Sequence, residues 1–308
     1  IMSATGTEAA AFKYWEKWMK KKDNDEMFQI VKTAHATKYD DGMQRSSFQI
    51  NNTLLTTNRK VLQKIAQPSI DFCNSLKLNV DAYVRWLEIE STQRCSINRV
   101  LVDLYHQNPD VQNWTWWKDQ RRTKISAFKR DRLLQGKLFQ PGDNLTICGN
   151  PIALLMAVVG EDPIKEGCFY LEDDAIQCYT EQFAPREYIA GFRSPHNSPN
   201  NIVYLHNVYP NLIRLYFPKL GKNVIVINGI CTDVQPRLSG QDLDSDAIFA
   251  TNQPDIVTLA KQAYAEYPTI INAVKPETNK YGKNMKSFME MDKKISDGQM
   301  DVGYSSNM

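Results

Sequence analysis

The 308-residue sequence lacks several features that would point to common classes of protein. Its six cysteines form no C-x-x-C pair and no zinc-type set with the four histidines, which argues against a zinc finger or a disulfide framework. Reduced thiols in a cytoplasm are therefore expected. No apolar run reaches 18 residues, so no membrane-spanning segment is expected. The net charge of +2 is too small to indicate nucleic-acid binding, so any basic surface must be local.

Glycine is missing from residues 43–135, although it occurs on either side of that segment. This absence predicts helices, with one helix starting after Gln67 because Pro68 suits a first turn, and a break at residues 107–110. From residue 136 glycine and proline return, and short β-branched runs between turn residues predict strands. These runs are "NLTIC", "CFYL", "YIAGF", "NIVYL", "NVIVI" and "AIFAT". After Pro254 the pattern is helical again, so the sequence predicts an α+β fold.

Three aspartates alternate in the stretch "SGQDLDSDAIFA", directly before an apolar run. If the stretch were an extended strand, Asp242 and Asp246 would lie about 13 Å apart. They can therefore share one cation with Asp244 only on a curled loop, which Ser239 and Gly240 permit. Converging carboxylates repel one another unless a cation neutralises them. A solvated acidic turn and a magnesium site are both open interpretations of this motif.

A calcium loop of the EF-hand type fits the same motif poorly. That loop needs glycine at its sixth position and a bidentate glutamate at its twelfth. Here those positions hold Ala247 and Gln253. Magnesium, which prefers carboxylate oxygens together with substrate phosphates, is the better expectation.

The segment "GFRSPHNSPNNIVYLHN" at residues 191–207 precedes "RLSGQDLDSDAIFATN" at residues 237–252. Together with "GKLFQPGDNLTICGNP" at residues 136–151, this order resembles the catalytic barrel of the two-barrel RNA polymerases. That superfamily includes the largest subunit of cellular RNA polymerase, the cellular RNA-dependent RNA polymerases and single-chain phage-type relatives. The run "RSP" resembles its R-x-P segment, and "DLDSD" resembles its metal loop. The resemblance implies a double-psi β-barrel catalytic domain flanked by helical segments.

The resemblance also implies a reaction, in which an RNA 3′-hydroxyl attacks the α-phosphate of a nucleoside triphosphate on a DNA or RNA template. Asp242, Asp244 and Asp246 would hold the first of two Mg²⁺ ions, and the second would arrive with the nucleotide. Arg193 would lie near the nucleotide ribose. Ser245 departs from the family pattern, which has glycine there, and a left-handed backbone would cost serine about 1 kcal/mol. That departure puts the metal geometry in doubt.

Residues 118–137 form a strongly basic segment, with eight basic and two acidic side chains. Such a segment either contacts the phosphates of a template or product or forms a solvated helix face. The candidate nucleic-acid-binding residues are Arg121, Arg122, Lys124, Lys129 and Arg130. The neighbouring Trp114, Trp116 and Trp117 are expected in the core rather than in base stacking.

The resemblance divides the chain into four parts. Residues 1–50 would hold an N-terminal helix and the end of a first barrel, 51–132 a helical connector, 133–265 the double-psi barrel and 266–308 a truncated helical tail. In the superfamily the first barrel supplies lysines to the triphosphate, which makes Lys32 and Lys38 candidate substrate contacts. No complete first barrel is recognisable, so the sequence is expected to be a fragment that is inactive alone.

Two other functions fit the sequence. A nucleic-acid-binding barrel without catalysis would follow if Ser245 spoiled the metal site. A metal-dependent phosphohydrolase would use water as the nucleophile, although such enzymes usually bring histidine or further carboxylates to a second metal. The polymerase interpretation implies a template, an RNA product and nucleoside triphosphates as partners, and no membrane. The compact single-chain format favours a phage-related, plasmid or bacterial setting for transcription, and nothing indicates the oligomeric state.

Overall fold

The structure is a computed structural model that describes Lys13, Lys17 and residues 42–91, 96–270 and 280–307. The chain divides into two compact units after residue 34, and everything from residue 42 onward belongs to the second. The candidate substrate residues Lys32 and Lys38 lie outside the described residues. Most of the helix predicted near the N-terminus also lies outside them.

The glycine-free stretch is mostly helical from Ile50 onward, as predicted, whereas Met43–Arg45 at its start form a strand. Asn58, Asn79 and Ser96 each accept a backbone N–H with the side chain at the start of a helix. The predicted helix start after Gln67 is wrong, because Pro68 lies inside a helix that begins at Arg59. An interior proline removes one helical hydrogen bond, a cost that the rest of a long helix can absorb. The helices are α3 (Ile50–Thr53), α4 (Arg59–Leu78), α5 (Val80–Glu90), α6 (Ile97–Gln107) and α7 (Thr115–Phe128), with a 3₁₀ turn at Pro109–Asn113 and a π turn at Lys129–Leu133.

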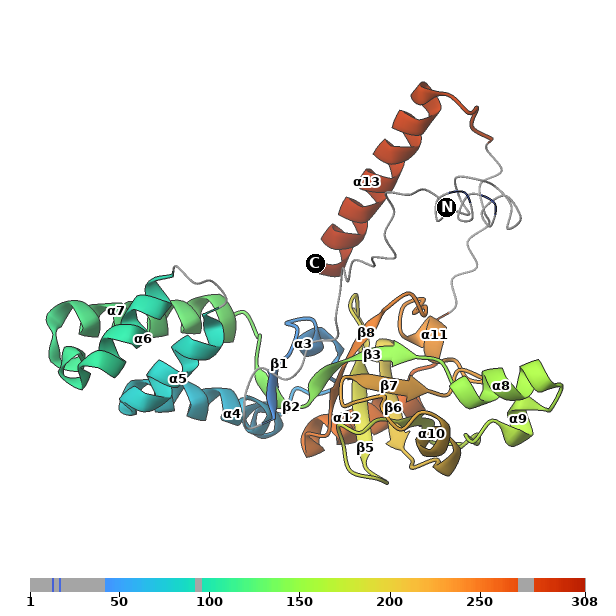
Figure 1. Ribbon diagram of the computed structural model, residues 1–308, viewed down its shortest axis with the longest axis horizontal. Coiled ribbons are helices and arrows are strands. Elements are labelled where there is room, and N and C mark those ends of the chain that lie inside the picture. Colours follow the sequence, from blue (N-terminus) through green and yellow to red (C-terminus); the bar gives the residue numbers. More distant parts are fainter. Residues whose placement is uncertain (1–12, 14–16, 18–41, 92–95, 271–279, 308) are drawn as a thin grey trace. The chain divides into compact units, whose positions relative to one another are not determined.

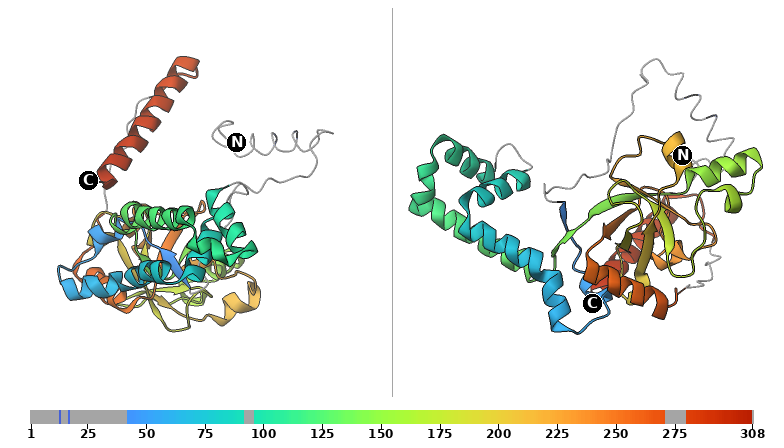
Figure 2. Two further views of the ribbon diagram at one scale, coloured as in Figure 1. Left: turned by 90° about the vertical axis from the view of Figure 1, so that its left-hand side faces the viewer. Right: turned by 90° about the horizontal axis from the view of Figure 1, so that it is seen from below.

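Helices α4 to α7 pack around a core of their own (Figure 2). Trp117 is fully buried there, and its ring lies edge-on to Tyr83 with the ring centres 5.4 Å apart. Trp114 and Trp116 are instead 51% and 43% exposed, so the core expectation holds for Trp117 alone. Strands β1 (Met43–Arg45) and β2 (Phe139–Pro141) form a short antiparallel pair beside the same core. Phe139 belongs to that core, and Met43 packs against it.

Six strands close into a barrel (Figure 1). Their order around the barrel is β3-β7-β4-β6-β5-β8, with β8 pairing back onto β3. Two pairs, β3 with β7 and β4 with β6, are parallel, and the others are antiparallel. This closed, mixed barrel flanked by helices confirms the predicted α+β barrel fold. The strands are β3 (Asp143–Cys148), β4 (Ile176–Tyr179), β5 (Tyr188–Phe192), β6 (Ile202–Asn207), β7 (Val224–Ile227) and β8 (Ala247–Thr251).

Five of the six predicted runs contain a barrel strand, and the sixth does not. The run "CFYL" at residues 168–171 is an irregular connection, and the strand in that region is β4, "IQCY". Every residue of β4 is buried, including Gln177, whose side chain accepts the backbone N–H of Tyr170 and donates to Glu172. A half-buried strand is recognised by alternating apolar and polar residues. Strand β4 is buried on both faces and contains a glutamine, so its sequence lacks that alternation.

Helices cover the outside of the barrel. Helix α12 (Pro254–Glu266) packs Ile256, Leu259, Ala260 and Ala263 against a cluster that includes Phe192 and Phe249 of the barrel. The remaining helices are α8 (Pro151–Val159), α9 (Pro163–Glu166), α10 (Asn211–Tyr216), α11 (Val234–Arg237) and α13 (Met285–Asn307). Among the residues described, no helix combines the length and apolar character needed to cross a bilayer.

Candidate metal centre

The three aspartates lie on the loop between α11 and β8. The loop curls back on itself, and one carboxylate oxygen of each aspartate lies within 4.8 Å of the others. The curl uses left-handed backbone at Ser239, Gly240 and Ser245, with φ of 56°, 70° and 90°. Ser245 therefore adopts a conformation that favours glycine, and the aspartates converge without glycine at that position.

Hydrogen bonds inside the loop hold the carboxylates together. The backbone N–H of Asp242 donates to Asp246 Oδ2 at 3.0 Å, and the N–H of Asp244 lies 3.4 Å from Asp242 Oδ1. Interaction with the Asp244 side chain and a hydrogen bond from the Asp244 backbone N–H lower the pKa of Asp242, and the charge of Arg193 lowers it further. The loop thus stabilises the charged form of this carboxyl group.

Strand register decides where the loop sits. Phe192 of β5 lies opposite Phe249 of β8, so the residues just after β5 face those just before β8. On the other side of β8, the backbone N–H of Ile147 on β3 donates to Asp246 O at 2.8 Å. The barrel therefore fixes Asp246 between two strands and brings Arg193 beside it.

Arg193 forms an ion pair with the third aspartate, Asp246. Its Nη2 lies 2.8 Å from Asp246 Oδ2, and the two side chains are only 16% and 20% exposed. Its Nη1 donates to the carbonyl oxygens of Leu238 at 2.9 Å and Ser239 at 3.2 Å. Arg193 therefore clamps the loop at both ends, before and after the exposed Asp242 and Asp244.

A second set of contacts holds the start of the loop to the segment after Arg193. The Ser239 hydroxyl donates to Pro195 O at 2.8 Å, and the Asn201 side chain donates to Arg237 O at 3.0 Å and contacts Ser239 Oγ at 3.2 Å. Asn201 was not among the site residues that the sequence predicted. No local pattern could reveal this role, because its partners lie 36 and 38 residues further along the chain.

Arg237, directly before the loop, is another residue that the sequence did not single out. It is 3% exposed and donates from Nε to Asp233 Oδ2 at 3.1 Å. Its other nitrogens point to the carbonyl oxygens of Asn200, Ile202 and Tyr267, and its guanidinium lies 4.6 Å from the ring centre of Tyr264. Arg237 thus ties α11 to β6 and to the segment after α12.

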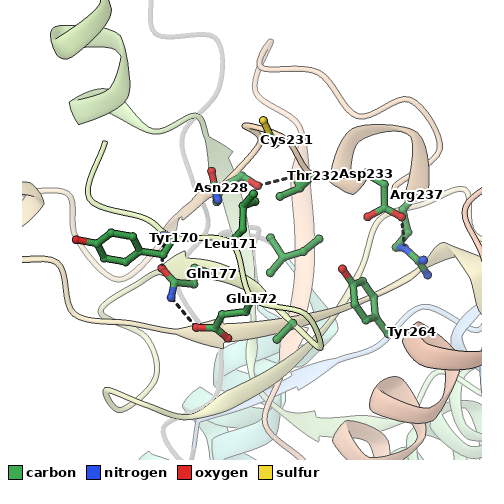
Figure 3. Close-up of a pocket in the computed structure, with 12 residues that line it drawn as sticks. Tyr170, Leu171, Glu172, Gln177, Asn228, Cys231, Thr232, Asp233, Arg237 and Tyr264 are labelled. Carbon is green, nitrogen blue, oxygen red and sulfur yellow. Dashed lines mark hydrogen bonds and ion pairs between the residues drawn. The ribbon is translucent and has the colours of Figure 1, made fainter. Parts of the chain in front are cut away.

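Arg237 and Asp233 form one wall of a pocket of about 380 Å³ (Figure 3). The other acidic residue in this pocket, Glu172, accepts a hydrogen bond from Gln177 and pairs with His206 Nδ1 at 2.9 Å. Both carboxylates of the pocket therefore already have hydrogen-bond partners among the side chains of the chain. Among the described residues, the only group of three or more potential metal ligands is the aspartate triad.

The triad fits a magnesium ion by donor type and spacing. Oxygens bound to one Mg²⁺ at about 2.1 Å lie at most about 4.2 Å apart. The observed limit of 4.8 Å is close enough for a small side-chain rotation to complete the site. Asp242 and Asp244 are exposed, which leaves room for such a rotation. The three residues could therefore hold a divalent cation.

His196 lies three residues after Arg193 but is not part of the aspartate triad. It is 1% exposed, its ring contacts Phe192, and its Nδ1 has no hydrogen-bond partner among the described residues. Burial lowers the pKa of His196 to about 4, so the folded protein holds it neutral. His196 is therefore a buried structural residue and is not one of the potential metal ligands.

The neutral state of His196 predicts a pH-dependent stability. An unfolded histidine titrates near pH 6.5, so between about pH 6.5 and 4 the unfolded chain binds more protons than the folded chain. Stability should therefore fall as pH falls, by about 2 kcal/mol from pH 7 to pH 5 for this residue. Urea unfolding of the wild type and of His196→Gln at pH 7 and pH 5 measures this change in the free energy of unfolding. The same pH dependence in both proteins would contradict the prediction.

The basic residues predicted to bind nucleic acid separate into two groups. Arg121, Arg122 and Lys129 line one pocket together with Lys77 and Lys118. Lys124 instead donates to Asn98 Oδ1 at 2.6 Å, and Arg130 makes two hydrogen bonds to Asp131, at 2.7 and 3.0 Å. None of these contacts tests nucleic-acid binding, which stays a prediction.

No family model matches the chain, and no curated protein matches it. Among solved structures, the chain is similar to the RNA-dependent RNA polymerase QDE-1 from Thielavia terrestris, with 14% sequence identity and a TM-score of 0.47. The match covers 84% of this chain and 29% of that one. The chain therefore spans less than a third of the length of that protein.

Proposed function

We propose that the chain carries the catalytic barrel of a templated RNA polymerase. The observation that carries this proposal is the meeting of three carboxylates and Arg193 where strands β5 and β8 come together. These residues belong to the two motifs, "RSP" and "DLDSD", on which the sequence resemblance depends. A merely solvated acidic turn would need neither the left-handed backbone nor the clamp.

In the proposed reaction the 3′-hydroxyl of an RNA loses its proton to solvent, and its oxygen forms a bond to the α-phosphorus of a nucleoside triphosphate. The bond from that phosphorus to the bridging oxygen breaks, and pyrophosphate leaves. Both the RNA and the triphosphate are anionic, so the aspartates would repel them without a divalent cation. A first Mg²⁺ bound to the triad and a second brought by the triphosphate would together stabilise negative charge on the attacking and leaving oxygens.

The chain's own residues divide the work around that site. Asp242 and Asp244 are exposed and supply ligand oxygens. Asp246 is held from two sides, because its Oδ2 accepts both Arg193 Nη2 and the N–H of Asp242. This fixes the direction of the third carboxylate before any ligand binds, which lowers the cost of assembling the site.

Arg193 has two proposed roles. By resemblance it would contact the ribose of the nucleotide. Its observed contacts instead direct both terminal nitrogens to the loop. We therefore assign Arg193 first to positioning the aspartates, and contact with a ribose would require Nη2 to share or leave Asp246.

The remaining assignments are extensions of the same proposal. They comprise the division into connector (51–132), catalytic barrel (133–265) and tail (266–308), a phage-related setting, and transcription in a cytoplasm. Lys32 and Lys38 stay candidate contacts for the triphosphate.

A product analysis tests the proposal with the natural full-length chain that carries this sequence. The protein is incubated with Mg²⁺, ribonucleotides and a primer on single-stranded RNA and DNA templates in parallel. Extended RNA and pyrophosphate are expected, and the preferred template identifies the branch of the superfamily. Release of phosphate from nucleotides without extension would instead indicate a phosphohydrolase. Template binding with neither product would indicate a binding barrel without catalysis.

A further inference from the structure

A second concave site lies on the helices rather than on the barrel. It is a pocket of about 400 Å³ formed by the last turn of α4, one face of α7 and the start of the π turn that follows α7. Five of its seven lining residues are basic, and none is acidic or aromatic. The lining consists of Lys77, Lys118, Arg121, Arg122 and Lys129, with Ile125 and Ser126. We call it the α4–α7 pocket.

One wall of the α4–α7 pocket is fixed before any ligand binds. Arg121 donates to the carbonyl oxygen of Leu76 from Nε at 3.1 Å and from Nη2 at 2.7 Å, and its Nη2 also donates to Lys77 O at 2.9 Å. Its guanidinium also lies 5.5 Å from the ring centre of Tyr83. The end of α4 therefore holds this cation in place at the pocket.

The other basic side chains of the pocket lie close together and have few acidic partners in the protein. The side chains of Lys77 and Lys129 approach each other, and this contact is the main reason that the pKa of Lys77 is lowered. Lys77 contacts the neutral Asn74 at 3.3 Å. Arg122 pairs with Asp119 at 3.1 Å, but both side chains are largely exposed, and such pairs contribute little. Clustered ammonium groups of this kind are stabilised when an anion binds between them.

We propose that the α4–α7 pocket binds the phosphodiester backbone of a single-stranded nucleic acid. Its lysines and arginines supply charge and hydrogen-bond donors for phosphate oxygens. It offers no aromatic ring for a base to stack on and no carboxylate to accept from a base edge, so binding is independent of base sequence. The site lies outside the aspartate loop and would bind whether or not the triad is catalytic.

The proposal changes which basic residues matter. Lys77 and Lys118 join the site although neither was among the sequence candidates. Lys124 and Arg130 lie outside this pocket, where Asn98 and Asp131 engage them. Helical periodicity explains the division, because residues 118, 121, 122, 125 and 129 share one face of a helix at spacings of three and four.

Equilibrium binding of a short, labelled single-stranded RNA of mixed sequence tests the proposal. Fluorescence anisotropy is measured across a salt series with the natural full-length chain, without nucleotides or Mg²⁺. Lys77→Gln combined with Lys129→Gln removes two cations. We expect about 25-fold weaker binding at 0.1 M salt and a slope of log K against log salt that is shallower by about 1.4. Both lysines are exposed, so folding should be unaffected.

A matched control removes two lysine charges from α4 outside the pocket. Lys60 and Lys64 are exposed on α4 and lie outside the pocket, and Lys60→Gln combined with Lys64→Gln should change neither affinity nor slope by a comparable amount. A second pocket variant, Lys118→Gln with Arg122→Gln, should match the first. Equal losses in the control and the pocket variants would overturn the proposal, as would the absence of RNA binding in the wild type.

A competition arm separates a nucleic-acid backbone from a free polyphosphate, which offers similar oxygens. Unlabelled single-stranded RNA or DNA should displace the probe better than inorganic tripolyphosphate at the same concentration of phosphate groups. Equal displacement by tripolyphosphate would overturn the nucleic-acid assignment. Because no nucleotide turnover is involved, failure here leaves the polymerase proposal standing, and failure of RNA synthesis leaves this proposal standing.

Discussion

Replacing Asp244 with asparagine is expected to slow magnesium-dependent RNA extension about a thousandfold. Asp244 supplies one of the three carboxylate oxygens that converge within 4.8 Å. Asparagine keeps the size of the side chain but removes its charge, so electrostatic stabilisation of several kcal/mol in the transition state is lost. A loss of about 4 kcal/mol corresponds to about a thousandfold in rate. The rate of primer extension by the natural full-length chain measures the effect.

The side chain of Asp244 is exposed, so the variant should fold normally. Thermal unfolding should place its midpoint close to that of the wild type. The matched control is Asp174→Asn, which removes an exposed carboxylate that pairs with Lys261 at 3.4 Å outside the loop, and it should extend RNA normally. Extension by Asp244→Asn at the wild-type rate, with wild-type dependence on magnesium, would remove the triad from the mechanism.

Replacing Arg237 with methionine is expected to destabilise the protein by about 2–3 kcal/mol, because its buried guanidinium is a hydrogen-bond donor to groups that would then be left unsatisfied. The guanidinium of Arg237 is almost fully buried, and Asp233 would lose its cation. The carbonyl oxygens of Asn200, Ile202 and Tyr267 would lose a donor as well. Urea unfolding measures the change in the free energy of unfolding.

Arg214→Met is the control for the loss of an arginine. Arg214 stacks over Tyr209 at 4.1 Å on an exposed part of α10, and its removal should cost less than about 1 kcal/mol. If the charge on Asp233 causes the loss in Arg237→Met, then adding Asp233→Asn should recover part of the stability. A double variant no more stable than Arg237→Met would assign the loss to the backbone carbonyls and packing. A loss below 1 kcal/mol for Arg237→Met would contradict the structural role.

The strands and helices that the sequence predicted share a clear local signal. "NVIVI" and "AIFAT" are short, apolar and bounded by turn residues, and both contain barrel strands. The helical stretch lacks glycine, and its caps are the polar residues Asn58, Asn79 and Ser96. Where the signal was ambiguous the prediction failed. Pro68 did not start a helix, and the strand near residue 170 lies later, at Ile176–Tyr179.

The candidate site divides in the same way. The spacing of the three aspartates, together with Ser239 and Gly240, sufficed to predict a curled loop that could hold a cation. The sequence could not show that Ser245 accepts a left-handed backbone or that Arg237 is buried. It also missed Asn201, because a side chain that reaches a loop 36 residues away leaves no periodic mark.

By itself, the sequence determined the elements and the chemical type of the site, because propensities, caps and carboxylate ligands are properties of neighbouring residues. The tertiary structure decided which distant residues meet. Closure of the barrel places β8 between β3 and β5, and only that register sets Arg193 against Asp246. The packing of α4 on α7 likewise assembled Lys77 with Lys129, which no pattern of spacing connects. Contacts of this kind depend on strand pairing and helix packing over long separations, so they exist only in the folded chain.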